Sequence, residues 1–512
     1  MTDTSQPGGV SARTMILPLA LAQFICSYAA TNMNVAITSI AKDLHTTVLG
    51  LQATITLFTL TMASLMIPGS KLTAIWGRKR CFVAGLLVYG IGALLGAFAP
   101  GLGVMILGYS FLEGIGSALL IPPIYILVTV AFTDIRQRAR NFGVVSGAGG
   151  LGAAAGPLIG GVITSAVGWR WSFIAQVLVV ASIVLLSRRI ADPGVTGPKP
   201  FDIEGAVLCG AGLFFVVLGI LQSSKYGWFA ARESFSIGGT VVIPKGGVSP
   251  VWLFVAVGAA ILAWFFGHIW SREKKGREPL LPLRLFRDRT SNLGLGTQTI
   301  QWLIMQGTFF VASVFLQEVR GYSAIKTGLV LTPATVGILI ASAAAERFAK
   351  RHSQPWIIRV GFAVTVIGLV LLVALVREKS PIITFVPGLF LIGIGVGAML
   401  TSSVNVVQSA FPEADQDNIS GLSRSVSNLG SSLGTAMAGS IIAAAAVPGN
   451  KSFALSIVII LAITLVGLVL ALLLSQQQAV SGGRADSTAR AAGQRTGRDR
   501  SVRRRPARTS PG

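Results

Sequence analysis

One carboxylate in this sequence lies where a reversible proton carrier would be needed. Glu113 is near the middle of a long apolar segment, residues 102–131, and of the 19 acidic residues it alone is deep inside such a segment. Tyr109, Ser110 and Ser117 share its helical face, which is small and polar. An ionised carboxylate in lipid costs about 2.5 kcal/mol or more, so such residues usually serve function. We therefore predict that Glu113 binds a proton or another cation; the alternative is a structural acid that hydrogen-bonds to a neighbouring helix.

The composition indicates that the elements around Glu113 lie in a membrane. Hydrophobic residues make up 52% of the chain and charged residues only 12%, with a mean hydropathy of +0.71. A soluble domain has about 25% charged residues, so an ordinary aqueous surface is excluded. The net charge of +23 does not indicate nucleic-acid binding, because Lys and Arg occur in short runs between apolar segments and in the last forty residues.

Fourteen apolar segments are long enough to cross a bilayer, and in lipid each must close its own backbone hydrogen bonds as a helix. They lie at residues 15–37, 51–69, 81–99, 102–131, 140–165, 171–187, 204–223, 251–270, 292–317, 326–345, 356–376, 381–405, 418–446 and 453–474. If the N-terminus is inside, most of the 42 Lys and Arg residues fall in cytoplasmic segments. The sequence thus predicts an all-α polytopic membrane protein with both termini cytoplasmic.

The order of the spans predicts two six-helix bundles with two helices inserted between them. The predicted regions are a cytoplasmic N-terminus (1–14), an N-terminal bundle (15–190), an inserted pair (191–291) with an exterior loop (224–250) and a cytoplasmic loop (271–291), a C-terminal bundle (292–474) and a disordered Arg-rich cytoplasmic tail (475–512). The tail could contact anionic lipid or remain solvated without a role. Residues 235–243 alternate around two glycines, which fits a small hairpin or a plain flexible loop.

Glycines define the strongest local motif. Gly152, Gly156 and Gly160 recur every four residues, so they form one smooth helix face that a neighbouring helix can approach closely. Pro157 removes a backbone donor and bends the helix, and Gly161 extends the motif. Generic tight packing in a membrane protein is the alternative explanation.

This segment resembles the antiporter motif on the fifth helix of exporters of the major facilitator superfamily. The sequence that follows it is similar to the tryptophan-rich stretch of the fourteen-helix drug:proton antiporters. Matching stretches in both halves are Trp169-Arg170-Trp171-Ser172-Phe173, Phe315-Leu316-Gln317, Gly321-Tyr322-Ser323 with Gly328, Ser420-Gly421-Leu422 with Gly430, and Asn34-Val35-Ala36. The resemblance covers about residues 15–475 and implies two bundles that rock about a central cavity.

The loop after the second helix is similar to the superfamily's cytoplasmic signature, with Gly77 for a tight turn and Arg78, Lys79 and Arg80 holding the loop inside. Any short positive-inside loop is the alternative. Ala74 stands where the family usually has Asp, which is thought to latch the halves near a helix end. Such a charge typically contributes about 0.3–1 kcal/mol, so its absence should weaken one closed state.

Two further positions depart from the family pattern. Ser110 replaces the usual Arg of the fourth helix, and Ala29 replaces the Asp that many relatives carry on the first. The resemblance therefore leaves Glu113 as the main candidate for proton coupling. In the second half, Arg424 lies about two turns into its helix, where it either extends to the interface or contacts a cytoplasmic gate or an anionic group of the substrate.

Polar residues predicted to face a central substrate cavity lie on several spans. They are Asn32, Asn34, Tyr109, Ser117, Gln298, Gln301 and Gln306. Each Asn or Gln alone is more often a contact between helices. No cofactor, metal set, Walker sequence or nucleophile–base arrangement is visible, so no enzyme is predicted.

We expect a monomeric secondary transporter in the plasma membrane, with a bacterial source favoured. Its predicted function is export of small amphipathic or drug-like molecules by proton antiport, and its partners are the substrate, protons and membrane lipids. The alternatives are export of an endogenous metabolite, such as an antibiotic or an amino acid, and a membrane sensor with a transporter-like fold.

Overall fold

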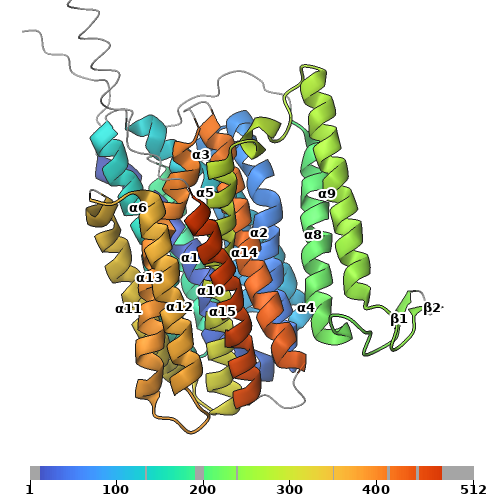
Figure 1. Ribbon diagram of the computed structural model, residues 1–512. Helices are drawn as coiled ribbons and strands as arrows, with labels where there is room; N and C mark the ends of the chain where they lie inside the picture. Colours follow the sequence, from blue (N-terminus) through green and yellow to red (C-terminus); the bar gives the residue numbers. More distant parts are fainter. Residues whose placement is uncertain are drawn as a thin grey trace, which may run out of the picture.

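The structure is a computed structural model that describes residues 12–132, 135–188, 190, 201–237, 240–349, 351–411, 415–444 and 449–474. Helices that run side by side dominate it (Figure 1). Those before the inserted pair are α1 (Ala12–Asp43), α2 (Val48–Trp76), α3 (Arg78–Ala97), α4 (Leu102–Met105), the π-helix η1 (Ile106–Glu113), α5 (Gly114–Ala131), α6 (Ile135–Ala166) and α7 (Arg170–Ser187). We call them the N-half.

The inserted pair consists of α8 (Ile203–Tyr226) and α9 (Pro250–Lys274), with strands β1 (Phe235–Ile237) and β2 (Thr240–Ile243) between them and the short η2 (Leu283–Phe286) after them. The remaining elements form the C-half. They are α10 (Arg289–Val314), the π-helix η3 (Phe315–Val319), α11 (Ala324–Ala349), α12 (Gln354–Leu375), η4 (Ile382–Thr384), α13 (Phe385–Ser409), α14 (Gln416–Ala444) and α15 (Asn450–Leu473).

The number of membrane spans follows from helix length and composition. Within the described residues, 12 helices are long and apolar enough to cross a bilayer, and a thirteenth is counted if the two pieces of α6 form one span. The predicted fourteenth corresponds to α14, which has 29 residues but does not meet that test because it is rich in Ser and Gly. An all-α polytopic membrane protein is confirmed, whereas the count of fourteen spans stays a prediction.

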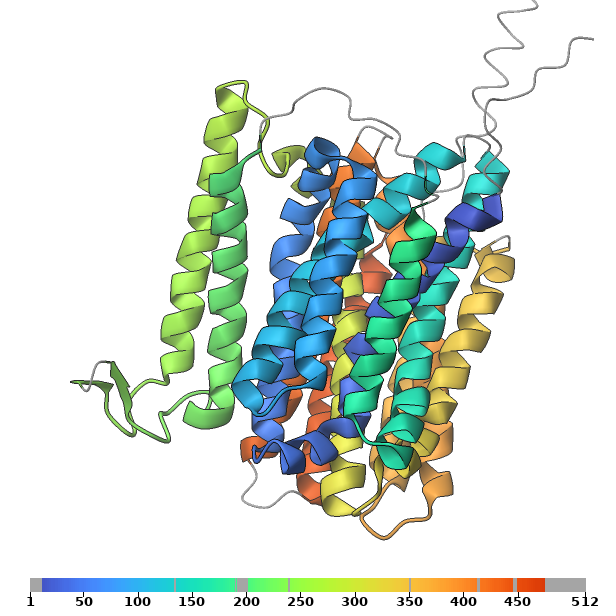
Figure 2. The same ribbon diagram turned by 180° about the vertical axis from the view of Figure 1, so that it is seen from behind.

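The helices form one bundle with the inserted pair at its side. Figures 1 and 2 show α8 and α9 beside the other helices, and α8 packs against both α2 and α14. The start of α1 and the end of α15 lie at the same end of the bundle, which we call the inner end; the opposite end is the outer end. The hairpin lies at the outer end of the inserted pair.

Polar caps set where several of these helices begin. The side chain of Thr47 accepts from the backbone of Gly50 (3.1 Å) at the start of α2, and Asp288 accepts from Ser291 (2.6 Å) at the start of α10. These side chains satisfy backbone donors that lack a partner within the helix. Ser249 caps α9, whose first residue is a proline.

The hairpin between the inserted helices is one of the two alternatives that the sequence left open. Strands β1 and β2 pair antiparallel, with Ile237 opposite Thr240 and Phe235 opposite Ile243. The two glycines of its turn lie outside the described residues, as do residues 1–11 and the Arg-rich tail from 475 onward. The domain limits expected from the sequence therefore remain predictions.

Candidate functional site

Glu113 is fully buried inside the N-half. It is the last residue of η1, where the π-helix returns to the α-helix of α5. Short π segments within helices occur frequently at functional sites. Gly92 of α3 lies so close that an added Cβ would be 2.7 Å from the backbone nitrogen of Glu113. Neither carboxyl oxygen has a hydrogen-bond partner of standard distance and angle among the described residues, although the hydroxyl of Tyr89 lies close enough to interact with the carboxyl group.

Three polar side chains lie within electrostatic range of this carboxyl group: Cys26, Tyr89 and Tyr109. Tyr89 donates its hydroxyl hydrogen to Oε1 of Gln176 (2.6 Å), and Tyr109 donates to a backbone carbonyl of α1 (3.1 Å). A tyrosine hydroxyl has one hydrogen, so both are already committed. Each tyrosine oxygen can still accept a hydrogen bond. This suits a protonated Glu113, which can donate one, better than the carboxylate, which cannot.

At the positions where the resemblance to the family led us to expect charge, the described residues make neutral contacts. Ser110 donates to the backbone carbonyl of Thr54 (2.7 Å) and so joins η1 to α2. Ala29 is buried, and its carbonyl accepts from Tyr109. The side chain of Ala74 lies outside the described residues. Within the described N-half, Glu113 therefore has no ion-pair partner.

The glycine face of α6 packs directly on α1. An added Cβ at Gly152 would overlap the backbone carbonyl of Phe24, and one at Gly160 would overlap the side chain of Asn32. Gly156 is in similar contact with α1 one turn away. The two pieces of α6, Gly143–Ala153 and Ala155–Ala166, meet at a bend of 42°. Close approach and a bend are what the motif predicts.

We call the contact surface between the N-half and the C-half the seam. Helices α2 and α14 meet there, with Nε2 of Gln52 donating to the carbonyl of Ala436 (3.1 Å). Helices α6 and α11 also meet there, because an added Cβ on Gly328 would overlap the carbonyl of Pro157. The third line of contact along the seam is between α1 and α10, where Gln306 donates to a backbone carbonyl of α1 (2.9 Å). We call it the α1–α10 line.

Two halves of six helices, joined through these pairs, match the arrangement that the resemblance implied. The sequence profile of the Major Facilitator Superfamily matches residues 19–435 and, in a second overlapping match, residues 294–508. The chain belongs to this superfamily. It is thus a multi-pass membrane protein of a transporter superfamily, and its family supports a small-molecule substrate rather than an enzymatic reaction.

Alignments with curated relatives cover most of this chain. Multidrug resistance protein Stp of Mycobacterium tuberculosis is 26% identical over 436 residues, which cover 84% of this chain and 76% of the relative. The probable actinorhodin transporter of Streptomyces coelicolor is 26% identical, covering 80% and 69%. Cephamycin export protein CmcT of Amycolatopsis lactamdurans is 27% identical, covering 85% and 86%.

The predicted cavity residues of this transporter do not all reach the seam. Within the N-half, Asn32 donates to Ser172 of α7 (2.8 Å), and Ser117 contacts the thiol of Cys26. Within the C-half, Gln298 accepts from Ser423 and Gln301 accepts from Ser403, both at 2.9 Å. The predicted residues placed on the α1–α10 line are Asn34 and Gln306. Their role in binding substrate stays a prediction.

Two motifs of the superfamily make contacts that fit their spacing. Gly77 has a φ of 98°, so the turn between α2 and α3 requires glycine. Lys79 then donates to the carbonyls of Arg188 (3.2 Å) and Ile190 (2.6 Å) at the end of α7. Arg78, another basic residue of this motif, is partly buried, and Arg80 is exposed. The loop thus joins two helices of the N-half.

At the other end, the tryptophan-rich stretch ties the turn between α6 and α7 to neighbouring helices. Arg170 forms an ion pair with Asp43 at the end of α1 and lies 4.3 Å from the ring centroid of Trp169. Trp169 itself donates to the same carboxylate (3.1 Å).

Arg424 crosses the seam near the inner end. Its guanidinium hydrogen-bonds to the hydroxyl of Tyr125 on α5 and lies 4.8 Å from the centre of that ring. A residue of the C-half thereby contacts the N-half at the end where the sequence placed a gate. The gate role itself stays a prediction.

Sequence reasoning missed a polar cluster at the inner end of the inserted pair. Asp202, which precedes α8, accepts from Nε2 of His268 (2.9 Å) and from the backbone N–H groups of Gly205 and Leu280 (both 3.0 Å). Arg272 adds its charge at 3.5 Å. Burial alone would raise the pKa of Asp202, but these donors together hold that pKa below its ordinary value.

Proposed function

We propose that this chain exports small amphipathic or drug-like molecules across the plasma membrane by proton antiport. The observation that carries the proposal is Glu113, a buried acid with no hydrogen-bond partner among the described residues, inside a transporter of this superfamily. A buried carboxylate without donors is costly unless its protonation state changes as part of function. The names of its relatives, which include a multidrug resistance protein and an export protein, support the direction of transport.

The proposed mechanism is alternating access. Glu113 takes up a proton from outside, and as a neutral acid it can donate to the oxygen of Tyr89 or Tyr109. The halves then rearrange along the seam, the proton leaves on the inner side, and substrate leaves on the outer side. The bend and smooth face of α6 would allow this helix to move against α1 and α11. Arg424 would close the inner end.

The orientation and partners follow from the same proposal. Both termini would be cytoplasmic, the basic tail could rest on anionic lipid, and one chain would suffice for transport. A second candidate is export of an endogenous antibiotic, which the names of the actinorhodin transporter and the cephamycin exporter favour. Both candidates use the same site and differ in substrate.

Transport in proteoliposomes tests the proposal. Purified protein is reconstituted, a pH gradient is imposed, and uptake of ethidium and of norfloxacin is followed with and without a proton uncoupler. We expect gradient-dependent transport of at least one compound, and a loss of more than about tenfold in Glu113→Gln, since coupling requires a titratable group. The control is Glu233→Gln, an exposed acid beside the hairpin whose ion pair among the described residues is with Lys225.

The possible results separate the parts of the proposal. Native-like, gradient-dependent rates in Glu113→Gln would remove this residue from the mechanism. A transport rate that is the same with and without the uncoupler would contradict proton antiport. If the native chain transports neither these dyes and drugs nor an antibiotic of the relatives' kind, the export function is wrong.

A further inference from the structure

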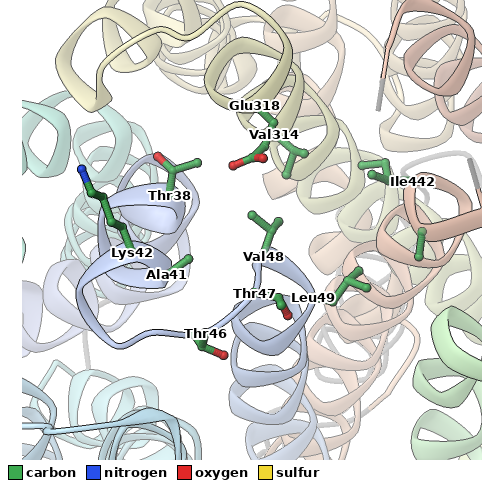
Figure 3. A pocket seen from close by; sticks show the side chains of 11 residues that line it. Thr38, Ala41, Lys42, Thr46, Thr47, Val48, Leu49, Val314, Glu318 and Ile442 are labelled. Atoms are coloured by element: carbon green, nitrogen blue, oxygen red, sulfur yellow. The ribbon is translucent and has the colours of Figure 1, made fainter. Parts of the chain in front are cut away.

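A pocket of about 490 Å³ opens at the outer end of the seam (Figure 3). We call it the outer pocket. It is lined by residues of both halves: Thr38, Ala41, Lys42, Thr46, Thr47, Val48 and Leu49 from α1, α2 and the turn between them, and Val314, Glu318, Ile442 and Ala443 from α10, η3 and α14. A compound leaving between the halves on this side would pass these side chains.

The outer pocket carries one charge of each sign, on opposite halves. Lys42 belongs to α1 and Glu318 to η3, and Figure 3 shows the two side chains on facing walls. Both are exposed, and no ion pair joins either of them to another described residue. The apolar side chains of Val48 and Val314 also line the pocket. This combination fits an amphipathic molecule with a cationic and an anionic group.

The floor of the outer pocket is a hydrogen-bonded crossing between the halves. Thr38, which lines the pocket, donates its hydroxyl hydrogen to Oε1 of Gln317 (2.7 Å). Nε2 of Gln317 in turn donates to the backbone carbonyl of Asn34 (3.1 Å). Gln317 precedes Glu318 in η3, so the charged wall and the floor belong to the same short π-helix.

Below this floor, the two facing helices present polar groups without partners. Asn34 lies one turn before Thr38 on α1, and Ser313 lies one turn before Gln317 on α10. Both side chains are buried, and neither the amide of Asn34 nor the hydroxyl of Ser313 has a hydrogen-bond partner in the described part of the chain. Deeper still, Gln306 closes the same line of contact. Buried polar groups are normally paired, so these two leave hydrogen-bonding capacity for water or for a polar group of a passing substrate.

We propose that the outer pocket is an exit site for amphipathic zwitterions, with an ammonium group held by Glu318 and an anionic group by Lys42. Release of the hydrogen bond between Thr38 and Gln317 connects this site to the buried polar groups of Asn34 and Ser313. The inference rests on the proposed export function, because only an exporter discharges its substrate on this side. It names a substrate class that the family alone does not.

Binding to purified protein tests the charges of the pocket. Norfloxacin carries an ammonium and a carboxylate at neutral pH, and its methyl ester keeps only the ammonium. Both are titrated, by fluorescence polarisation, against the full chain in lipid nanodiscs. We expect norfloxacin to bind about threefold to fivefold more tightly than the ester, as partly exposed charge contacts give.

Three variants sharpen the result. Lys42→Gln should remove the difference between norfloxacin and its ester, whereas Glu318→Gln should weaken both. Exchanging the charges, with Lys42→Glu and Glu318→Lys together, should restore the preference that Lys42→Glu alone removes. Glu233→Gln, outside the pocket, should bind as the native chain does. Equal affinities for the two compounds in the native chain, or affinities that the pocket variants leave unchanged, would overturn the proposal.

Chemical labelling tests the connection below the floor. The three native cysteines are buried, so a cysteine introduced by Ser313→Cys can be followed with a membrane-impermeant maleimide. Thr38→Val keeps the shape of the side chain but removes its hydrogen bond to Gln317. In the Ser313→Cys background we expect Thr38→Val to speed labelling from the outer side several-fold. An unchanged labelling rate would show that the Thr38–Gln317 contact does not close this path.

These measurements remain distinct from the test of the export function. The binding assay needs neither a gradient nor turnover. Charge-dependent binding without gradient-driven transport would support the outer pocket as a binding site and contradict proton antiport. Transport that continues unaltered in Lys42→Gln and Glu318→Gln, together with unaltered binding, would keep the exporter and reject the pocket.

Discussion

Glu113 and Asp202 are both buried carboxyl groups, yet their surroundings are opposite. Asp202 accepts from His268, from two backbone N–H groups and faces the charge of Arg272. The hydroxyl groups of Tyr89 and Tyr109 lie near Glu113, but each already donates its hydrogen elsewhere. Tyr89 donates to Gln176, and Tyr109 donates to a backbone carbonyl of α1. The first arrangement stabilises a fixed negative charge, and the second leaves the carboxyl group ready to gain or lose a proton.

The comparison shows how to separate structural from functional acids in a membrane protein. A carboxylate that joins a helix start, a second helix and a loop has no freedom to change charge without loosening all three. A carboxylate with no donors among the described residues does not hold its surroundings together. Burial alone therefore does not identify a proton carrier, but burial combined with missing donors does support one.

The largest expected effect is on stability, and it should separate the two acids. Asp202→Asn replaces an acceptor with an amide that would face donors, so we expect it to lower the free energy of unfolding by about 2 kcal/mol. Glu113→Gln removes no described hydrogen bond and should change that free energy by less than about 0.5 kcal/mol. Thermal unfolding in nanodiscs measures both. A comparable loss in the two variants would break the distinction.

Acid should remove the stabilisation that Asp202 provides. Because its folded-state pKa is lowered, its contribution is complete above the unfolded-state pKa of about 3.9 and is lost as the pH falls through the folded-state value. The gap in unfolding temperature between the native chain and Asp202→Asn should therefore be constant near neutral pH and narrow below about pH 4. A gap that widens on acidification would contradict this sign.

A smaller effect is expected from Tyr89→Phe. It removes the hydroxyl that interacts with the Glu113 carboxyl group, a contact typically worth about 1 kcal/mol. The external pH of half-maximal efflux should shift by less than one pH unit. Tyr28→Phe serves as the control, because its hydroxyl makes a comparable buried contact with Ser172 (2.6 Å). An equal shift in both variants would mean that the tyrosine acts through packing alone.

The smallest effect should come from Arg284→Ala. Arg284 pairs with Asp415 at the start of α14, but its side chain is 65% exposed. Exposed ion pairs typically contribute about 0.5 kcal/mol, so the unfolding temperature should fall only slightly and efflux should be unchanged. A loss as large as that of Asp202→Asn would show that the loop after α9 matters as much for stability as the capped start of α8.

Local sequence patterns predicted the helices well because lipid imposes a simple rule. A long apolar segment must be a helix, so the predicted spans at 102–131 and 251–270 lie within helical stretches of closely similar bounds. The burial of Glu113 followed from the same rule. The apolar test fails at α14, whose many serines bond to backbone carbonyls, as Ser432 does to Thr56 of α2 (3.0 Å).

Contacts between distant residues could not be predicted from one sequence. Asp202 and His268 are 66 residues apart, and neither carries a local signal for the other. Gln317 belongs to a matched stretch, but its bond to Thr38 spans 279 residues. Asn32 looked like a cavity residue because its chemistry is that of Asn34, yet a rotation of two positions along α1 turns it towards α7 instead.

The position of α8 restricts how an oily compound can arrive from the bilayer. Because α8 packs against both α2 and α14, it shields the line where these two helices meet from surrounding lipid. Helices α6 and α11 meet on a line that α8 does not touch among the described contacts. A lateral portal for membrane-dissolved substrates is therefore expected beside α6 and α11, so that the inserted pair makes entry from the lipid one-sided.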